Sequence, residues 1–149
     1  MPLSLSAVAL LLFIQTAATA ATPIDVVKKF YDAYQRLDID GMTAVMSPDM
    51  EFDDPTFRLH ANNRAEWRKQ AEPNRLVITR IGAEIHSTVQ SGDTVAVELT
   101  LSGGIKTKAG VRDFKVRCAS FFTVRNSLIT RWTDYCDYRT FTEQTTPTR

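Results

Sequence analysis

Two aspartates in this sequence stand beside aromatic residues and could carry out acid–base chemistry. Asp134 comes two residues after Trp132, and Asp54 follows the short run 50–53, which includes Phe52. A carboxylate in an apolar pocket has its charged form disfavoured, so its pKa rises and it can exchange a proton near neutrality. We therefore expect Asp134 and Asp54 to be catalytic if the fold turns them inward. Otherwise, Asp134 would only hydrogen-bond its neighbours, and Asp54 would lie in a solvated turn.

A β-hairpin is expected to position Asp134. The runs 116–124 and 128–141 are rich in β-branched and aromatic residues, and the polar break 125–127 separates them. Because side chains alternate across a strand, Trp132, Asp134 and Cys136 would share one face. A turn centred on Ser127 would pair Phe122 with Trp132, Ser120 with Asp134, and Cys118 with Cys136. A two-residue turn would shift this register by one, and both registers remain open.

The N-terminus has the pattern of a secretory signal peptide. An apolar run, 7–14, precedes Ala18-Thr19-Ala20, which predicts a signal peptide over residues 1–20. The run is too short to span a bilayer, so we expect no membrane association after cleavage. A disordered or membrane-tethering N-terminus is the alternative. Secretion would place the protein in an oxidising, extracellular environment, where Cys118 and Cys136 would form a disulfide. Two buried free thiols are the alternative to the disulfide.

Length and charge limit the remaining classes. Without its first 20 residues, the 149-residue chain suffices for one domain, expected over 21–141, with a flexible tail over 142–149. Eighteen Lys and Arg against 17 Asp and Glu give a net charge of +1, and no basic stripe with interleaved aromatic residues is present. Nucleic acid is therefore not an expected partner. No histidine stands at ligand spacing from the two cysteines, so no metal site is expected.

Helices precede strands along the chain. Thr22, Pro23 and Asp25 mark the start of an amphipathic helix, Asp38 caps a second helix through residue 46, and residues 61–72 form a third. The strands that follow are expected over 76–89, 94–101, 111–124 and 128–141. This order predicts an α+β fold, with the helices on one face of a strongly bent antiparallel sheet.

Two segments carry a family resemblance. Phe122-Thr123-Val124, a polar turn, and Leu128 to Asp137 resemble the terminal hairpin of SnoaL-like polyketide cyclases and limonene-epoxide hydrolases, in the nuclear transport factor 2-like superfamily. The segment 26–55 is similar to the opening of SnoaL-like and ketosteroid isomerase-like domains. The resemblance implies a cone-shaped, cystatin-like α+β barrel with three N-terminal helices and a central cavity. It also implies a homodimer through the outer face of the sheet.

The resemblance also implies roles for residues. Asp134 matches the first aspartate of the epoxide hydrolase signature, where the second acid would be Glu98, and Asp54 matches the general base of the isomerases. Tyr31, or else Tyr34, would be a phenolic donor. The expected ligand-binding residues are Tyr31, Phe52, Glu98, Ser120, Phe122 and Trp132. His86 is a further candidate base, because dehydratases of this superfamily use histidines, and no cofactor is implied.

Two functions follow from these observations. The first is a secreted protein that binds a small, mostly apolar molecule and performs isomerisation, cyclisation, dehydration or epoxide opening on it. The second is a secreted protein that binds a ligand or a partner without catalysis. The two differ in whether Asp134 faces an enclosed pocket or whether aromatic side chains fill that space.

Overall fold

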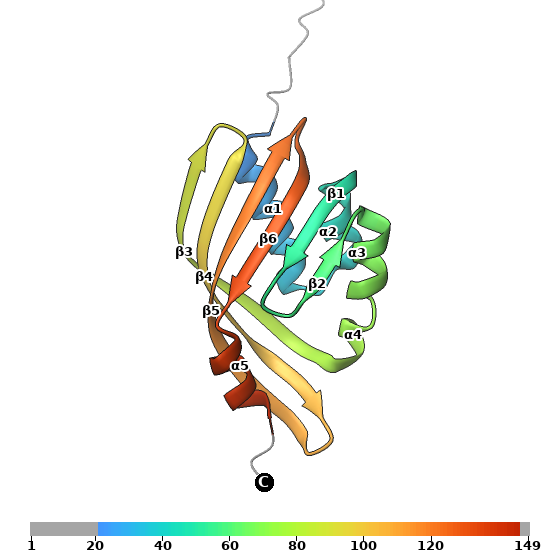
Figure 1. Ribbon diagram of the computed structural model, residues 1–149, viewed down its shortest axis with the longest axis vertical. Coiled ribbons are helices and arrows are strands. Elements are labelled where there is room, and N and C mark those ends of the chain that lie inside the picture. The colour runs from blue at the N-terminus through green and yellow to red at the C-terminus, as the bar shows by residue number, and fades with distance from the viewer. Residues whose placement is uncertain (1–20, 147–149) are drawn as a thin grey trace, which may run out of the picture.

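The helices at the N-terminal end form where their capping residues predict. Figure 1 shows the computed structural model, which describes residues 21–146, so the predicted signal peptide lies outside the described residues. Helix α1 (Pro23–Gln35) starts with a capping box, in which the side chains of Thr22 and Asp25 each accept from the other's backbone N–H. Helix α2 (Ile39–Ala44) is capped by Asp38, as predicted.

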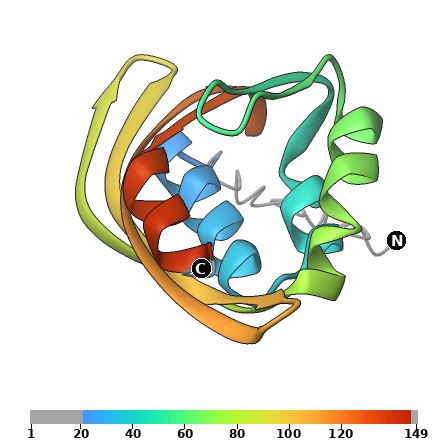
Figure 2. The ribbon, with the colours of Figure 1, turned by 60° about the horizontal axis from the view of Figure 1, so that its bottom comes forward.

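The rest of the described chain forms one curved sheet with further helices. The elements after α2 are β1 (Met46–Asp54), β2 (Leu59–Ala61), α3 (Arg64–Ala71), α4 (Asn74–Val77), β3 (Ile78–Ser91), β4 (Thr94–Thr107), β5 (Gly110–Arg125), β6 (Leu128–Cys136) and α5 (Tyr138–Thr145). The strand order is β2-β1-β6-β5-β4-β3, and neighbours are antiparallel except for the parallel pair β1–β6. Figure 2 shows the sheet curving around α1, with α2 and α3 across from β3 and β4. The predicted α+β fold is confirmed.

The first strand is longer than predicted. We expected it over 50–53, but β1 begins at Met46 and includes Pro48. Its register against β6 shifts between Met46 and Glu51, around the proline, which has no N–H to donate to a ladder. The third helix starts at Arg64, capped by Asn63, because Ala61, its expected first residue, belongs to the short strand β2.

The C-terminal end differs from the expected strand and tail. The last strand ends at Cys136 instead of continuing to Phe141, and α5 continues into the segment expected to be a flexible tail. The Asp137 carboxylate caps α5 by accepting from the Thr140 N–H at 3.0 Å, and the Phe141 ring packs 5.2 Å from that of Phe114. This cap and this contact fix the helix. Residues 147–149 lie outside the described residues.

The hairpin β5–β6 has the predicted pairs but not the predicted turn. Asn126 and Ser127 form a two-residue turn with φ of 50° and 60°, as a hairpin turn of this length requires. Near the turn, Arg125 pairs with Leu128, and then a bulge in β6 shifts the register by one residue. Beyond the bulge, the predicted pairs form: Phe122 with Trp132, Ser120 with Asp134, and Cys118 with Cys136. The two cysteines form a disulfide, as predicted.

An aromatic cluster joins α1 to this hairpin. The Phe30 ring is fully buried and lies 5.4 Å from the Phe122 ring and 4.8 Å from the Trp132 ring. The Phe52 ring of β1 also packs against Trp132, at 4.5 Å. This cluster fixes the indole, and with it the strand that carries Asp134. Within residues 21–146, no helix is long and apolar enough to cross a bilayer.

Candidate functional site

The curved sheet and the helices enclose a mostly apolar cavity of about 420 Å³. Aromatic rings from several elements line it, among them Phe52 of β1, Trp67 of α3, Trp132 of β6 and Phe141 of α5. The carboxyl and guanidinium groups among the lining residues are those of Asp54, Asp134 and Arg75. A cavity of this size and polarity suits a small, largely apolar molecule.

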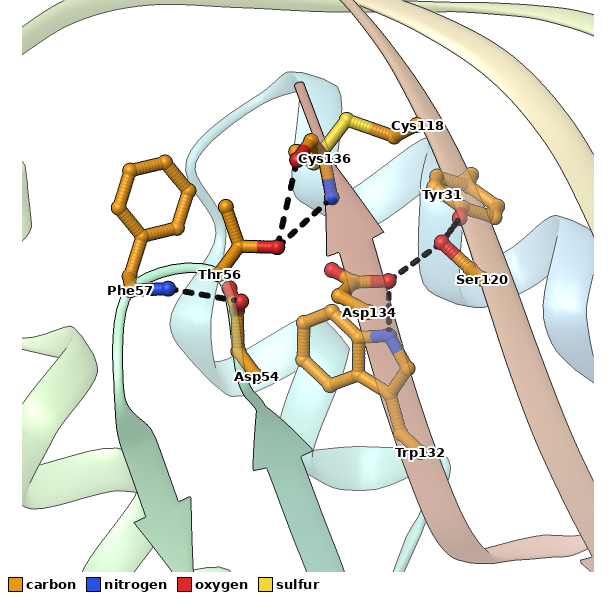
Figure 3. The surroundings of a disulfide bond; sticks show 9 residues. All are labelled: Tyr31, Asp54, Thr56, Phe57, Cys118, Ser120, Trp132, Asp134 and Cys136. Atoms are coloured by element: carbon orange, nitrogen blue, oxygen red, sulfur yellow. Dashed lines mark hydrogen bonds between the residues drawn. A yellow bond between two sulfur atoms is a disulfide. The ribbon is translucent and has the colours of Figure 1, made fainter. Parts of the chain in front are cut away.

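Asp134 lies in the wall of this cavity, with one oxygen held by hydrogen bonds. Its Oδ1 accepts from Trp132 Nε1 at 2.8 Å and from the Ser120 hydroxyl, and Tyr31 in turn donates to Ser120 at 2.8 Å (Figure 3). Among the described residues, no side chain hydrogen-bonds Oδ2, and Figure 3 shows this oxygen pointing away from Ser120. The free oxygen is therefore the one that a molecule in the cavity could reach.

Burial shifts the protonation of Asp134. Loss of solvation raises the pKa of Asp134 to about 7, although the hydrogen bonds from Ser120 and Trp132 act in the opposite direction. The negative charge of Asp54 raises it further. The carboxyl group therefore exchanges its proton near neutral pH, as a general acid or base requires.

Asp54 stands beside Asp134 on the neighbouring strand. Phe52 pairs with Trp132 and Asp53 with Thr133, so the parallel register leads Asp54 towards Asp134 at the end of the ladder. Burial raises the pKa of Asp54, against the hydrogen bond that its Oδ1 accepts from the Phe57 N–H at 3.1 Å. The structure thus brings the two predicted catalytic residues together in one cavity.

The predicted ligand-binding residues divide into three groups. Phe52 and Trp132 line the cavity. Tyr31, Ser120 and Phe122 are buried but do not line it, so they support the wall from behind. The prediction that Glu98 faces inward is wrong, because Glu98 lies on the outer face, where it forms an ion pair with Arg117.

Histidines do not contribute to the cavity wall. The His86 ring is exposed and lies 2.7 Å from the Thr100 hydroxyl, and the exposed His60 ring lies 3.8 Å from the Asp53 carboxylate. No group of three or more His, Cys, Asp or Glu side chains within residues 21–146 is placed to hold a metal ion. A molecule bound in the cavity would therefore meet no histidine, and the ionisable side chains that it could contact are Asp54, Asp134, Tyr34 and Arg75.

Several lining residues were not singled out from the sequence. Tyr34 of α1, expected only as the alternative to Tyr31, lines the cavity, and burial raises the pKa of its hydroxyl. Phe57 lies on the loop between β1 and β2, and its ring packs 5.1 Å from that of Phe141. Arg75 reaches the cavity from α4, a helix that was not predicted. The available signal for Tyr34 was its position three residues after Tyr31, about one helical turn along α1, which places both tyrosines within the apolar stripe of this helix.

The raised pKa of Asp134 predicts a pH-dependent stability. The unfolded chain releases this proton at about pH 4, whereas the folded state keeps it to about pH 7. The free energy of unfolding should therefore fall as pH rises through this window, by about 1.4 kcal/mol per pH unit, and then become constant. Urea unfolding of the wild type and of Asp134→Asn at pH 5 and pH 8 measures this, with the variant gaining relative stability at pH 8. A difference that stays the same at both pH values would contradict the shift.

Comparisons with known proteins agree with this fold. The SnoaL-like domain model matches residues 27–132. A proposed SnoaL-like polyketide cyclase from Shewanella putrefaciens CN-32 shares 16% identity at a TM-score of 0.75, over 82% of this chain and 94% of that one. IdmH, a proposed polyketide cyclase from Streptomyces antibioticus, shares 20% identity at a TM-score of 0.72, over 83% and 98% of the two chains.

A third similar structure is a complex with a small molecule. This protein from Catenulispora acidiphila DSM 44928 has a ketosteroid isomerase-like fold and is in complex with trimethylamine; it shares 19% identity at a TM-score of 0.73, over 80% of this chain and 91% of that one. None of the curated proteins matches the chain. At these identities the solved structures establish the fold alone, and they confirm the predicted nuclear transport factor 2-like, ketosteroid isomerase-like fold. The match over residues 27–132 shows that the chain belongs to the SnoaL-like domain family.

Proposed function

We propose that the protein binds a small, mostly apolar molecule in its cavity and transforms it by acid–base chemistry. One observation carries the proposal: Asp134 has one oxygen fixed by Ser120 and Trp132, while the other is free at the wall of an apolar cavity. A carboxyl group held in this way can give or take a proton at a defined position on a bound molecule.

The two aspartates would act as a general acid and a general base. Two carboxyl groups that lie close together disfavour double ionisation, so one holds a proton while the other is charged. With Asp134 titrating near pH 7, one of the pair acts as base and the other as acid within a single cycle. Tyr34 lines the same cavity with a hydroxyl that stays protonated, so it is a candidate donor to an oxygen on which negative charge develops.

The positions of the acidic residues favour isomerisation, cyclisation and dehydration over epoxide opening. Isomerisation, cyclisation and dehydration each need a base and an acid placed on one substrate, which Asp134 and Asp54 provide. The epoxide hydrolase resemblance assigned the second acid to Glu98, which lies on the outer face. Epoxide opening would therefore have to use Asp54 as the second acid, on a different strand.

We further propose that the protein is secreted and forms a homodimer. Secretion is supported by the sequence pattern of residues 1–20 and by the disulfide, which suits an oxidising compartment. The dimer is supported by an apolar pair on the outer face of the sheet, where the Phe121 and Tyr135 rings lie 6.1 Å apart and are nearly half exposed.

The proposed function is tested by identifying the bound molecule. Small molecules that copurify with the protein can be extracted and identified by mass spectrometry, and conversion of each by the protein can then be assayed. We expect an apolar molecule with a carbonyl, hydroxyl or epoxide group and a measurable conversion. If a copurifying molecule of this kind is bound but never converted, the protein is a non-catalytic binding protein.

A further inference from the structure

The sheet does not extend far enough to fix the distance between the two aspartates. The ladder between β1 and β6 ends at the pair Asp53–Thr133, one residue before Asp54 and Asp134. After Asp54 the chain leaves β6 and turns towards β2 through residues 55–58, where Arg58 has a φ of 56°. Asp54 itself pairs with Leu59 of β2, so its distance from Asp134 depends on a contact outside the β1–β6 ladder.

Thr56 makes that contact. Its hydroxyl accepts from the Cys136 N–H at 2.9 Å and lies 3.4 Å from the Cys136 carbonyl oxygen, to which it can donate (Figure 3). One side chain thus pairs with both backbone groups of Cys136, as a further strand residue would. Cys136 is itself fixed to β5 through its disulfide with Cys118. The loop after β1 is therefore tied to an end of β6 that cannot move freely.

The same loop holds the Asp54 carboxylate. Asp54 Oδ1 accepts from the Phe57 N–H, so the segment from Asp54 to Phe57 forms one hydrogen-bonded unit. Moving Thr56 away from Cys136 would move Asp54 with it. We infer that Thr56 is a positioning residue of the proposed site, which holds Asp54 beside Asp134 by tying the β1–β2 loop to the end of β6.

The consequence appears in the titration of Asp134. The titratable groups that face Asp134 are Asp54 from β1 and Tyr31 and Tyr34 from α1, and Arg75 of α4 lines the same cavity. Of these, only Asp54 adjoins the loop that Thr56 holds. If the loop opens, the charge of Asp54 moves away and water enters, and both changes lower the pKa of Asp134.

The experiment is a pH titration of the carbon-13 signal of the Asp134 carboxyl group by NMR. Thr56→Val keeps the shape of the side chain without its hydroxyl, and we expect its titration midpoint to fall by roughly half a unit to one pH unit. Thr56→Ser keeps the hydroxyl and should retain the wild-type midpoint. The matched control is Thr130→Val, which removes a hydroxyl that donates to the Thr123 carbonyl at 3.2 Å near the turn of the hairpin. It should leave the midpoint unchanged.

Two results would overturn the inference. The first is a wild-type midpoint in both Thr56→Val and Thr56→Ala, measured on protein whose near-ultraviolet circular dichroism shows a folded state. The second is a shift of the same size when Thr56→Val is made together with Asp54→Asn, because Thr56 would then act without Asp54. The inference rests on the proposed function, because it concerns the proposed catalytic pair. The NMR titration of Asp134 needs no substrate. A protein without turnover would refute the proposed function and leave the role of Thr56 testable.

Discussion

Replacing Asp134 with asparagine is expected to lower kcat/KM for the converted molecule by about 10²- to 10⁴-fold. The amide oxygen can still accept from Ser120 and Trp132, so the side chain should remain in place. What the variant loses is an exchangeable proton at the oxygen that reaches the cavity. Steady-state kinetics on the copurifying molecule, with the fold checked by circular dichroism, measure this loss.

The control for this prediction is Asp53→Asn. Asp53 precedes Asp54 on β1, its side chain is 44% exposed, and it does not line the cavity. We expect its kcat/KM to stay close to that of the wild type, whereas Asp54→Asn should lose activity because it removes the second carboxyl group of the pair. If Asp134→Asn and Asp54→Asn both leave turnover unchanged, neither aspartate is catalytic and the proposed function fails.

Replacing Phe30 with alanine is expected to lower the free energy of unfolding by about 3–5 kcal/mol. The Phe30 ring is fully buried and packs against the rings of Tyr31, Phe122 and Trp132, so its removal leaves a cavity between α1 and the hairpin. This is the largest effect that we expect on stability. Urea unfolding followed by tryptophan fluorescence measures it, since Trp132 lies in the same cluster.

Phe121 provides the matched control. It is the neighbour of Phe122 on β5, but it points to the outer face and is 44% exposed. Phe121→Ala should therefore change the free energy of unfolding by about 1 kcal/mol or less. Equal losses for the two phenylalanines would mean that the inner face of the sheet does not hold the core.

The alternation of side chains along the last strand was enough to predict that Trp132 and Asp134 face the cavity together. Trp132 and Asp134 have the same parity, and the structure places both on the inner side. The same rule could have excluded Glu98, since Val97 and Leu99 on either side of it are buried and must point the other way. The prediction of an inward Glu98 is wrong because it placed Glu98, and not its apolar neighbours, on the inner face of this strand.

Other features depend on contacts that a local pattern does not contain. The parallel pairing of β1 with β6 joins segments about eighty residues apart, and it brings Asp54 to the end of β6 that carries Asp134. The contact between Thr56 and Cys136 has the same long range. The bulge in β6 that restores the predicted hairpin pairs follows from a turn whose length was open in the sequence. Helix α5 is fixed by a cap and by the burial of Phe141 against other elements.

The central claim is that Asp134 lies at the wall of an apolar cavity in which it exchanges its proton near neutral pH. The titration of its carbon-13 carboxyl signal in the wild-type protein tests this claim most directly, with the signal assigned by its loss in Asp134→Asn. We predict a midpoint at about pH 7. A midpoint at about pH 4, the value of a solvated aspartate, would show that Asp134 is exposed to water and would contradict its role as a catalytic acid or base.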